Sequence, residues 1–536
     1  MRILRIQKAK PIALRIIGLF GQYKYIFLLL PVFFFRDYTP DNELKYLNIA
    51  AEALKNHTWF TFCSQGEIYA DKPPLYFWII MLSKLITGKY YMWLIGLFSL
   101  LPAMGTLIIM DKWMRSSAMG QNRIVANILL LTTIMFAGGV LIVRMDMLMT
   151  FFIVLSLYTF FKIYQKRCHP IERFLLPVYI FLAVFTKGPL GFLIPIVSIV
   201  VFLLWKKQIR SFTHYFGWKQ WSVMLGLCMI WFLGVFLEGG HEYLNNLLVK
   251  QTFGRGVNSF HHREPFWFYF PRMLWSFAPW ILLYIVLIIQ GVRKKMLKTD
   301  TQLFFAIICV TNIFMLSLIS SKLDIYMLPV YPFLVYLSAS FLPALAYNRI
   351  IKMSISIPAI IFILALPSSI LLKKLIPNEL SGILPYIGLG ILCISGASAI
   401  IMLLKNKALN AITCIGYGIL LLCFAGAFAL PYYNNYIGYR EMAETAKRAA
   451  ETEHITNLFC YNFRTAPEME VFIGQKIKDT QTIQQLDSLD KLQQKSILFI
   501  KSSDIRKETE LREWLHSKIA RWEAGNHQWY VIGGKE

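Results

Sequence analysis

The chain contains few cysteines and few charged residues, and acidic groups are the scarcer of the charged ones. Its eight cysteines form no C-x-x-C pair and lie mostly within apolar segments. This spacing indicates neither a zinc knuckle nor a disulfide framework. Charged residues make up only 16% of the 536 residues and hydrophobic residues 57%. The apolar residues form repeated runs of nearly bilayer length, so the composition is typical of a polytopic membrane protein.

The scarcity of acidic residues, 30 against 55 lysines and arginines, gives a formal net charge of +25. Most of the basic residues fall in short loops between apolar segments, as the positive-inside rule expects. No basic patch with interleaved aromatics occurs in a polar region, so nucleic-acid binding is not indicated. No internal repeat is apparent either, which argues against a secondary transporter built from inverted repeats.

The apolar runs predict thirteen spanning helices. The first is expected to be retained, because no small-residue cleavage site follows it. The predicted spans are about 13–35, 91–110, 124–143, 147–165, 172–186, 190–205, 221–238, 275–291, 303–319, 327–346, 353–372, 382–403 and 411–430.

With a cytoplasmic N-terminus, every second connection lies inside and carries a basic excess, whereas the polar clusters gather outside. The short run at 75–88 predicts a helix lying at the interface within a first outer loop, 36–90. Residues 1–430 then form an α-helical transmembrane domain. Residues 431–536 read as charged helices and short buried strands, which predicts a small soluble α/β domain on the outer side without a catalytic motif.

The first outer loop concentrates carboxylates, with six of the 30 acidic residues between 36 and 78. Asp41 and Glu43 follow Pro40 at the start of a predicted helix. Acidic residues are favoured in a first helical turn by the helix dipole alone. A partly buried carboxylate at a membrane edge can also bind an acceptor hydroxyl and take its proton. Both interpretations stay open.

The cations of the outer side suggest a phosphate site. Lys72 stands in Asp71-Lys72-Pro73-Pro74, where the following proline holds it in extended geometry. An ammonium fixed at this depth suits a phosphate, although a lysine that only reaches the interface has the same pattern. Lys187 and Arg144 flank apolar segments on the same predicted side and can complete a cationic cradle.

A divalent-metal site is a further expectation of the outer loops. His261, His262 and Glu264, together with Glu43 or Asp71, offer imidazole and carboxylate ligands that suit Zn²⁺ or Mn²⁺. Solvated loop histidines would give the same pattern. The aromatic run EPFWFYFPRMLWSFAPW that follows is compatible with an interfacial belt or with sugar and isoprenoid contacts.

Six segments in register resemble a known family. PDNELKY, ADKPPLYFW, RMDMLMTFF, TKGPLGFLIP, HHREPFWFY and SSKLDIYMLPVYP are similar, in this order, to segments of the lipid A aminoarabinose transferases and their relatives, the dolichyl-phosphate-mannose protein mannosyltransferases. The resemblance covers about residues 30 to 345. It implies the GT-C glycosyltransferase fold and a glycosylated polyprenyl phosphate as the donor.

The resemblance also implies roles for individual residues. In the family an acidic residue near the acceptor precedes Glu-x-Arg-Tyr, which appears here as Glu43-Leu44-Lys45-Tyr46. Strict register places Asn42 at the acidic position, so either Asp41 or Glu43 takes that role, and we favour Asp41. By the same resemblance, Asp146 is a positioning carboxylate. The lipid-phosphate group consists of Lys72, Lys187, Arg263 and Tyr326, and the metal ligands are Asp71 and either His261 or His262.

The sequence therefore predicts an inverting membrane glycosyltransferase of the bacterial inner membrane. It would move a sugar from polyprenyl phosphate to lipid A, a glycan or a protein at the outer face. The alternative is a flippase or transporter for polyprenyl-linked sugars or lipids, which would place polar groups near the bilayer midplane in broken helices.

Overall fold

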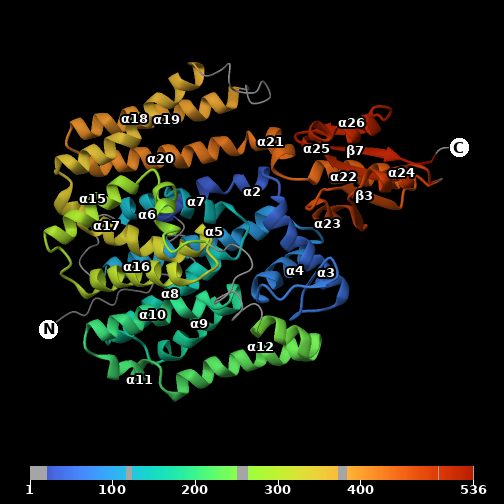
Figure 1. Ribbon diagram of the computed structural model, residues 1–536. Helices are drawn as coiled ribbons and strands as arrows, with labels where there is room; N and C mark the ends of the chain where they lie inside the picture. The colour runs from blue at the N-terminus through green and yellow to red at the C-terminus, as the bar shows by residue number, and fades with distance from the viewer. Residues whose placement is uncertain (1–20, 116–122, 250–263, 372–382, 493, 535–536) are drawn as a thin grey trace, which may run out of the picture.

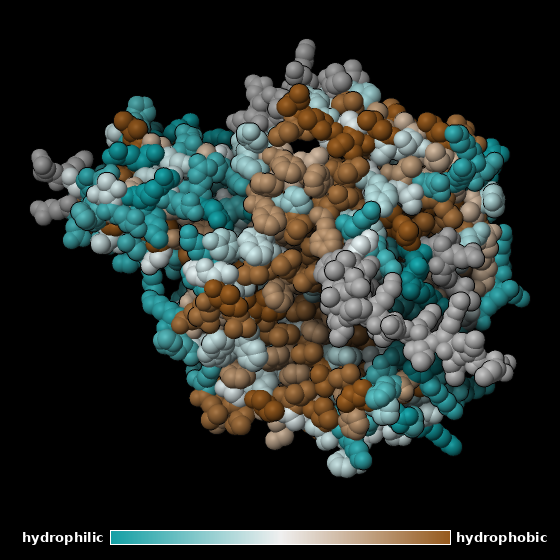
Figure 2. All heavy atoms as spheres, turned by 180° about the vertical axis from the view of Figure 1, so that it is seen from behind, coloured by the Kyte–Doolittle hydropathy of each residue, from teal (hydrophilic) through white to brown (hydrophobic). Residues whose placement is uncertain are grey.

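The computed structural model describes residues 21–115, 123–249, 264–371, 383–492 and 494–534. Figure 1 shows a large helical bundle with a small sheet domain, drawn in red, attached at one side. Seen from behind in Figure 2, hydrophobic side chains cover much of the bundle, whereas the sheet domain is mostly hydrophilic. An apolar surface of this extent marks contact with lipid.

Long apolar helices make up most of the bundle. Within the described residues, eight are long and apolar enough to cross a membrane, which confirms a multi-span membrane protein. They coincide with predicted spans and are α5 (Met92–Arg115), α8 (Asp146–Tyr164), α12 (Trp218–Asn245), α16 (Asp300–Leu318), η6 with α17 (Asp324–Val330 and Tyr331–Leu345), α18 (Arg349–Leu371), α19 (Ile383–Leu404) and α20 (Ala408–Ala427).

Two predicted spans, 124–143 and 275–291, fall on bent helix pairs rather than on single helices. α6 (Arg123–Leu131) and α7 (Ile134–Leu141) meet at 72°, and α14 (Tyr269–Ser276) and α15 (Ile281–Arg293) at 114°. The two breaks contact each other: the Ile134 amide donates to the Ala278 carbonyl at 3.0 Å, and the Trp280 indole donates to the Thr132 hydroxyl at 2.9 Å. Irregular backbone is tolerated inside a bilayer only where protein groups satisfy it, so each break stabilises the other.

The predicted spans 172–186 and 190–205 are helices of the predicted length, which is short for a bilayer. α9 (Glu172–Lys187) and α10 (Leu190–Trp205) have 16 residues each, or roughly 24 Å against about 30 Å of hydrocarbon. The first span is described as η1 (Lys24–Leu29) and α2 (Val32–Phe35). The thirteen ranges are therefore mostly helical where described, with breaks at 132–133 and 277–280. Among the described residues, eight helices, or ten spans if each bent pair counts as one, are long and apolar enough to cross a membrane, fewer than the thirteen predicted. η4 (Ile209–Ser211) and α11 (Phe212–Tyr215) connect α10 to α12.

The first outer loop folds into short elements against the bundle. They are η2 (Pro40–Leu44), α3 (Lys45–Asn56), the antiparallel pair β1 (Cys63–Ser64) and β2 (Glu67–Ile68), and α4 (Leu75–Thr87). α4 matches the predicted short helix, whose interfacial position stays a prediction. α3 buries one face, with Tyr46, Ile49, Ala50 and Ala53 at helical spacing, because the opposite face is polar.

The C-terminal region forms a five-stranded sheet covered by helices, as the predicted α/β character requires. The strand order is β4-β3-β5-β7-β6, with β3 parallel to β4 and β5 and the last two strands antiparallel. The sequence predicted β3, β5 and β7 but neither of the short edge strands β4 and β6. The elements are α21 (Leu430–Ile437), α22 (Arg440–Thr452), β3 (Asn457–Tyr461), η9 (Ala466–Met469), α23 (Glu470–Ile473), β4 (Ile477–Thr480), α24 (Ile483–Asp490), β5 (Ser496–Lys501), α25 (Ser502–Lys507), α26 (Thr509–Leu515), β6 (Trp522–Ala524) and β7 (His527–Ile532).

η9 and α23 dock this C-terminal domain onto α3. The Asn48 amide donates to the Pro467 carbonyl at 3.3 Å. Glu468 is buried at the same contact, with 6% of its surface exposed, and its Oε2 atom has no hydrogen-bond partner in the described part of the chain. Burial raises the pKa of Glu468 to about 7, and the charge of Lys45 opposes this shift only in part. The contact therefore favours the protonated acid.

We expect docking of the C-terminal domain to weaken as the pH rises. A raised pKa stabilises the fold fully below the unfolded value of 4.5, and this contribution is lost as the pH rises through about 7, with a total of roughly 3 kcal/mol. The apparent Tm of the wild type should fall between pH 5 and pH 8, whereas Glu468→Gln should fall less. Glu451→Gln, an exposed position on α22, is the control. Parallel curves for Glu468→Gln and wild type would contradict the assignment.

Candidate active site

A buried ion pair lies where α8 begins and α9 ends. The Lys187 ammonium bonds the Asp146 carboxylate, with their side chains 4% and 1% exposed. The Arg144 guanidinium lies 3.2 Å from the other carboxylate oxygen. The N-terminus of α8 favours the anion and the C-terminus of α9 the cation, so the helix dipoles support the pair.

The predicted phosphate-binding residues converge on this pair where they are described. The Lys187 ammonium lies 4.8 Å from the centre of the Tyr326 ring. Lys72 is close enough for its charge to act on Asp146. Arg263 lies outside the described residues. Lys72, Lys187 and Arg144 together exceed the neighbouring carboxylates Asp71 and Asp146 by one positive charge, which suits an anionic ligand.

A mostly apolar cavity of about 170 Å³ adjoins the ion pair. Asp71 and Lys187 are its charged lining residues, and Trp231 and Phe232 of α12 form part of its wall. Lys187 is followed by Gly188 at φ 100° and by Pro189, the N-cap of α10. The glycine permits the sharp turn that leaves the ammonium at the end of its helix. An apolar wall ending in a cation fits a lipid chain that carries a phosphate.

Asp41 and Glu43 occupy different environments although both belong to η2. Asp41 is exposed and pairs with Arg464 of the C-terminal domain at 2.6 Å. Glu43 is buried and accepts from both terminal nitrogens of Arg36, at 2.8 and 2.5 Å. It also accepts from the Val143 amide at 2.6 Å. These bonds give Glu43 a positioning role, because Val143 immediately precedes Arg144, and leave Asp41 as the more accessible carboxylate.

Two contributors were missed by reasoning from the sequence alone. Arg36 holds Glu43 and also donates to the Leu141 carbonyl at 3.2 Å. Tyr46 of α3 is buried, which raises its pKa to about 12, and the charges of Arg144, Asp146 and Asp71 act on its hydroxyl. Tyr46 stands in the Glu-Leu-Lys-Tyr motif, so its position was visible, whereas nothing near Arg36 marked it as a partner of Glu43.

The predicted metal site is only partly described. Asp71 lies at the apolar cavity, whereas His261 and His262 fall outside the described residues. In the part of the chain that is described, no three His, Cys, Asp or Glu side chains form a group able to hold a metal. The metal set of Asp71 with either histidine therefore stays a prediction.

Comparison with known proteins points to one group. Residues 71–236 match the family described as dolichyl-phosphate-mannose-protein mannosyltransferase. An uncharacterized protein of Aquifex aeolicus is 24% identical over 79% of this chain and 82% of its own length. The undecaprenyl phosphate-alpha-4-amino-4-deoxy-L-arabinose arabinosyl transferase of Pseudomonas savastanoi pv. phaseolicola is 26% identical over 56% of each chain. The match thus spans little more than half the length of that transferase.

The fold extends this similarity along nearly the whole chain. The crystal structure of ArnT from Cupriavidus metallidurans bound to undecaprenyl phosphate superposes with a TM-score of 0.75 at 15% identity, covering 98% of this chain and 100% of ArnT. The apo ArnT structure gives 0.74. The predicted fold class is therefore confirmed. The family match, the sequence relatives and the shared fold confirm the resemblance of this chain to the GT-C glycosyltransferases, the group of the aminoarabinose transferases and the protein mannosyltransferases.

Proposed function

We propose that this protein is a membrane glycosyltransferase that moves a sugar from a polyprenyl-phosphate donor to an acceptor with inversion. The observation that carries the proposal is the Lys187 ammonium, buried beside Asp146 at the end of an apolar cavity. A polyprenyl phosphate has the matching chemistry, a long apolar chain with an anionic head. The sequence relatives named for undecaprenyl-phosphate sugars and the fold shared with ArnT support the same class of donor.

In the proposed reaction, the phosphate-binding residues and the carboxylates have different roles. The acceptor oxygen attacks the anomeric carbon while the bond from that carbon to the phosphate oxygen breaks, and its electron pair stays on the phosphate. Lys187, Lys72 and Tyr326 stabilise the charge that develops there, with Arg263 as a further proposed ligand. Asp146 holds Lys187 in place. Asp41 orients the acceptor and takes its proton if the acceptor is a hydroxyl.

The setting of the enzyme is also part of the proposal. We propose that the active site and the C-terminal domain face the periplasm at a bacterial inner membrane, which the basic excess of the alternate loops supports. The acceptor class, whether lipid A, glycan or protein, is left to the transfer experiment. A divalent metal held by Asp71 and either His261 or His262 would neutralise phosphate charge when bound.

The transfer test uses purified full-length protein in detergent with a radiolabelled pool of polyprenyl-phosphate sugars. Lys72→Ala should lower transfer by about 10²-fold or more, because an interaction with the leaving phosphate is lost. Asp41→Asn should lower transfer while donor binding persists. Lys89→Ala and Glu67→Gln, exposed positions in the same loop, are the matched controls. Donor binding without label in any acceptor fraction would favour the transporter instead.

The Asp146–Lys187 pair predicts unequal costs for its two partners. Asp146→Asn leaves Arg144 and Lys187 facing each other and should destabilise the protein by about 3–5 kcal/mol. Lys187→Met should cost less, because Arg144 still neutralises Asp146. The double variant should cost less than the sum of the two, as apparent Tm values would show. Lys162→Met with Glu172→Gln, a pair that joins the same helices with side chains 28% and 23% exposed, is the control and should change less. Equal losses for both single variants would contradict the assignment.

The proposed metal has its own test. EDTA should remove bound Zn²⁺ or Mn²⁺, detected by elemental analysis of the protein, and lower transfer until the metal is restored. Asp71→Asn should bind less metal and respond less to EDTA. Unchanged metal content in Asp71→Asn would remove Asp71 from the ligand set without affecting the assignment of Lys72 and Lys187.

A further inference from the structure

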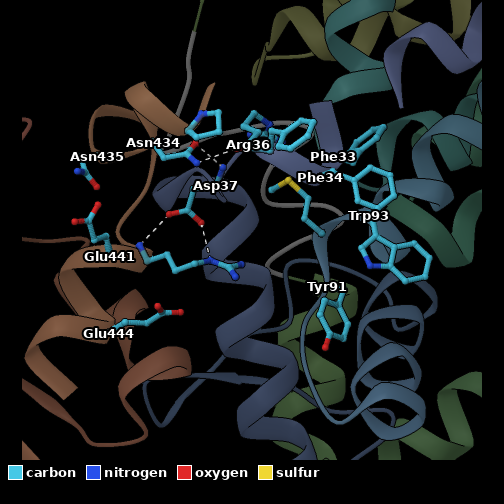
Figure 3. Close-up of a pocket in the computed structure, with 14 residues that line it drawn as sticks. Phe33, Phe34, Arg36, Asp37, Tyr91, Trp93, Asn434, Asn435, Glu441 and Glu444 are labelled. Carbon is cyan, nitrogen blue, oxygen red and sulfur yellow. Dashed lines mark hydrogen bonds and ion pairs between the residues drawn. The ribbon is translucent and has the colours of Figure 1, made fainter. Parts of the chain in front are cut away.

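A second cavity, of about 300 Å³, lies between the helical bundle and the C-terminal domain, apart from the cavity at Lys187. It is formed by the end of α2, the start of α5 and the segment from α21 to α22, and we name it the junction pocket. Figure 3 shows Phe34, Tyr91 and Trp93 on one side, Asn435, Glu441 and Glu444 on the other, and Asp37 between them. α5 and α20 are membrane spans that end here, so the pocket lies at a membrane edge.

The frame of the junction pocket is held by hydrogen bonds. Asn434 accepts from the Asp37 amide at 2.9 Å and donates to the Phe35 carbonyl at 2.8 Å. The Asp37 carboxylate, 4% exposed, accepts from the backbone amide of Arg440 at 2.8 Å. A Cβ at Gly438 would meet that carboxylate at 2.4 Å, so the approach is close. The two domains therefore meet in a defined geometry around the pocket.

Both signs of charge face this cavity. Arg440 uses its Nε atom toward Asp37, at 3.4 Å, and its side chain remains 43% exposed. Glu441 and Glu444 are exposed on the same helix, three residues apart, and their carboxylates make no hydrogen bond or ion pair within the described part of the chain. The lining also contains Arg36, which is bonded to Glu43, and Asp37, which is bonded to Arg440. Arg440, Glu441 and Glu444 therefore remain as one guanidinium and two carboxylates that a ligand can reach.

The opposite wall is aromatic. The Phe34 and Trp93 rings are stacked with their centroids 6.0 Å apart, and the centroids of the Tyr91 and Trp93 rings are 6.3 Å apart. Phe34 is 56% exposed although it belongs to an apolar helix. Aromatic side chains at the ends of spans lie at the level of lipid headgroups and the first acyl carbons.

We propose that the junction pocket binds the headgroup of a zwitterionic phospholipid of the phosphate–ammonium class, such as phosphatidylethanolamine. Arg440 would take the phosphate, Glu441 and Glu444 the ammonium, and the Phe34–Trp93 stack the glycerol and first acyl carbons. A purely anionic lipid would be repelled by the two carboxylates, and a simple cation by Arg440. The inference does not depend on the proposed transferase activity.

The test measures lipid binding to the full-length protein by native mass spectrometry in detergent. Phosphatidylethanolamine should bind about tenfold more tightly than phosphatidylglycerol with the same acyl chains. Glu441→Gln with Glu444→Gln should abolish this preference while leaving the Asp37–Arg440 contact in place. Glu451→Gln with Arg448→Gln, on the same helix but outside the pocket, should retain it. Trp93→Leu should weaken both lipids.

Two results would overturn the proposal. Equal binding of the two lipids to the wild type would contradict the proposed selectivity for a zwitterionic headgroup. Soluble glycerophosphoethanolamine binding as tightly as the lipid would show that the pocket takes a free headgroup and not a membrane lipid. A thermal-shift measurement on each variant checks that the protein remains folded.

Discussion

Much of the site depends on one buried carboxylate, that of Glu43. It accepts hydrogen bonds from both terminal nitrogens of Arg36, from the amide and hydroxyl of Thr39, and from the amide of Val143. A buried carboxylate is tolerated only when its oxygens are satisfied, so this set of donors fixes the first outer loop against the end of α7. Three residues after Val143 comes Asp146, which holds Lys187. The loop carrying Asp41 and the helix carrying Asp146 are thereby joined through one side chain.

This arrangement separates two kinds of polar surface. On the inner side of the loop, Asp146 and Lys187 are buried, Arg144 lies beside Asp146, and Lys187 lines an apolar cavity. On the outer side, Asp41 is exposed and meets Arg464 of the C-terminal domain. An exposed ion pair contributes little free energy, so Arg464 can be displaced by a ligand at small cost. A donor phosphate on the inner side and an acceptor on the outer side would then approach from opposite directions, as inversion requires.

The sequence predicted most of this fold and only part of its site. Hydrophobic runs locate helices because a bilayer demands about twenty apolar residues, and most of each of the thirteen ranges is helical where described. The length of an apolar run does not predict the breaks at Thr132 and Ala278, because these depend on contact between two segments far apart in the sequence. Lys72 and Lys187 were predicted from local motifs, and Tyr326 and Asp146 from the family resemblance. Arg36 was missed because its role comes from a hydrogen bond to a partner that no spacing rule identifies.

The C-terminal domain holds the first outer loop from the side opposite to Glu43. Glu43 fixes the inner side of η2, but the segment leading into it is held from the other direction, where Asp37 accepts from Arg440. η9 and α23 then cover α3 at Asn48 and Glu468. Asp41 stands between these two supports. A movement of the C-terminal domain would change the surroundings of Asp41 directly, whereas Asp146 and Lys187, buried within the bundle, would be unaffected. The domain therefore belongs physically to the acceptor side of the proposed reaction.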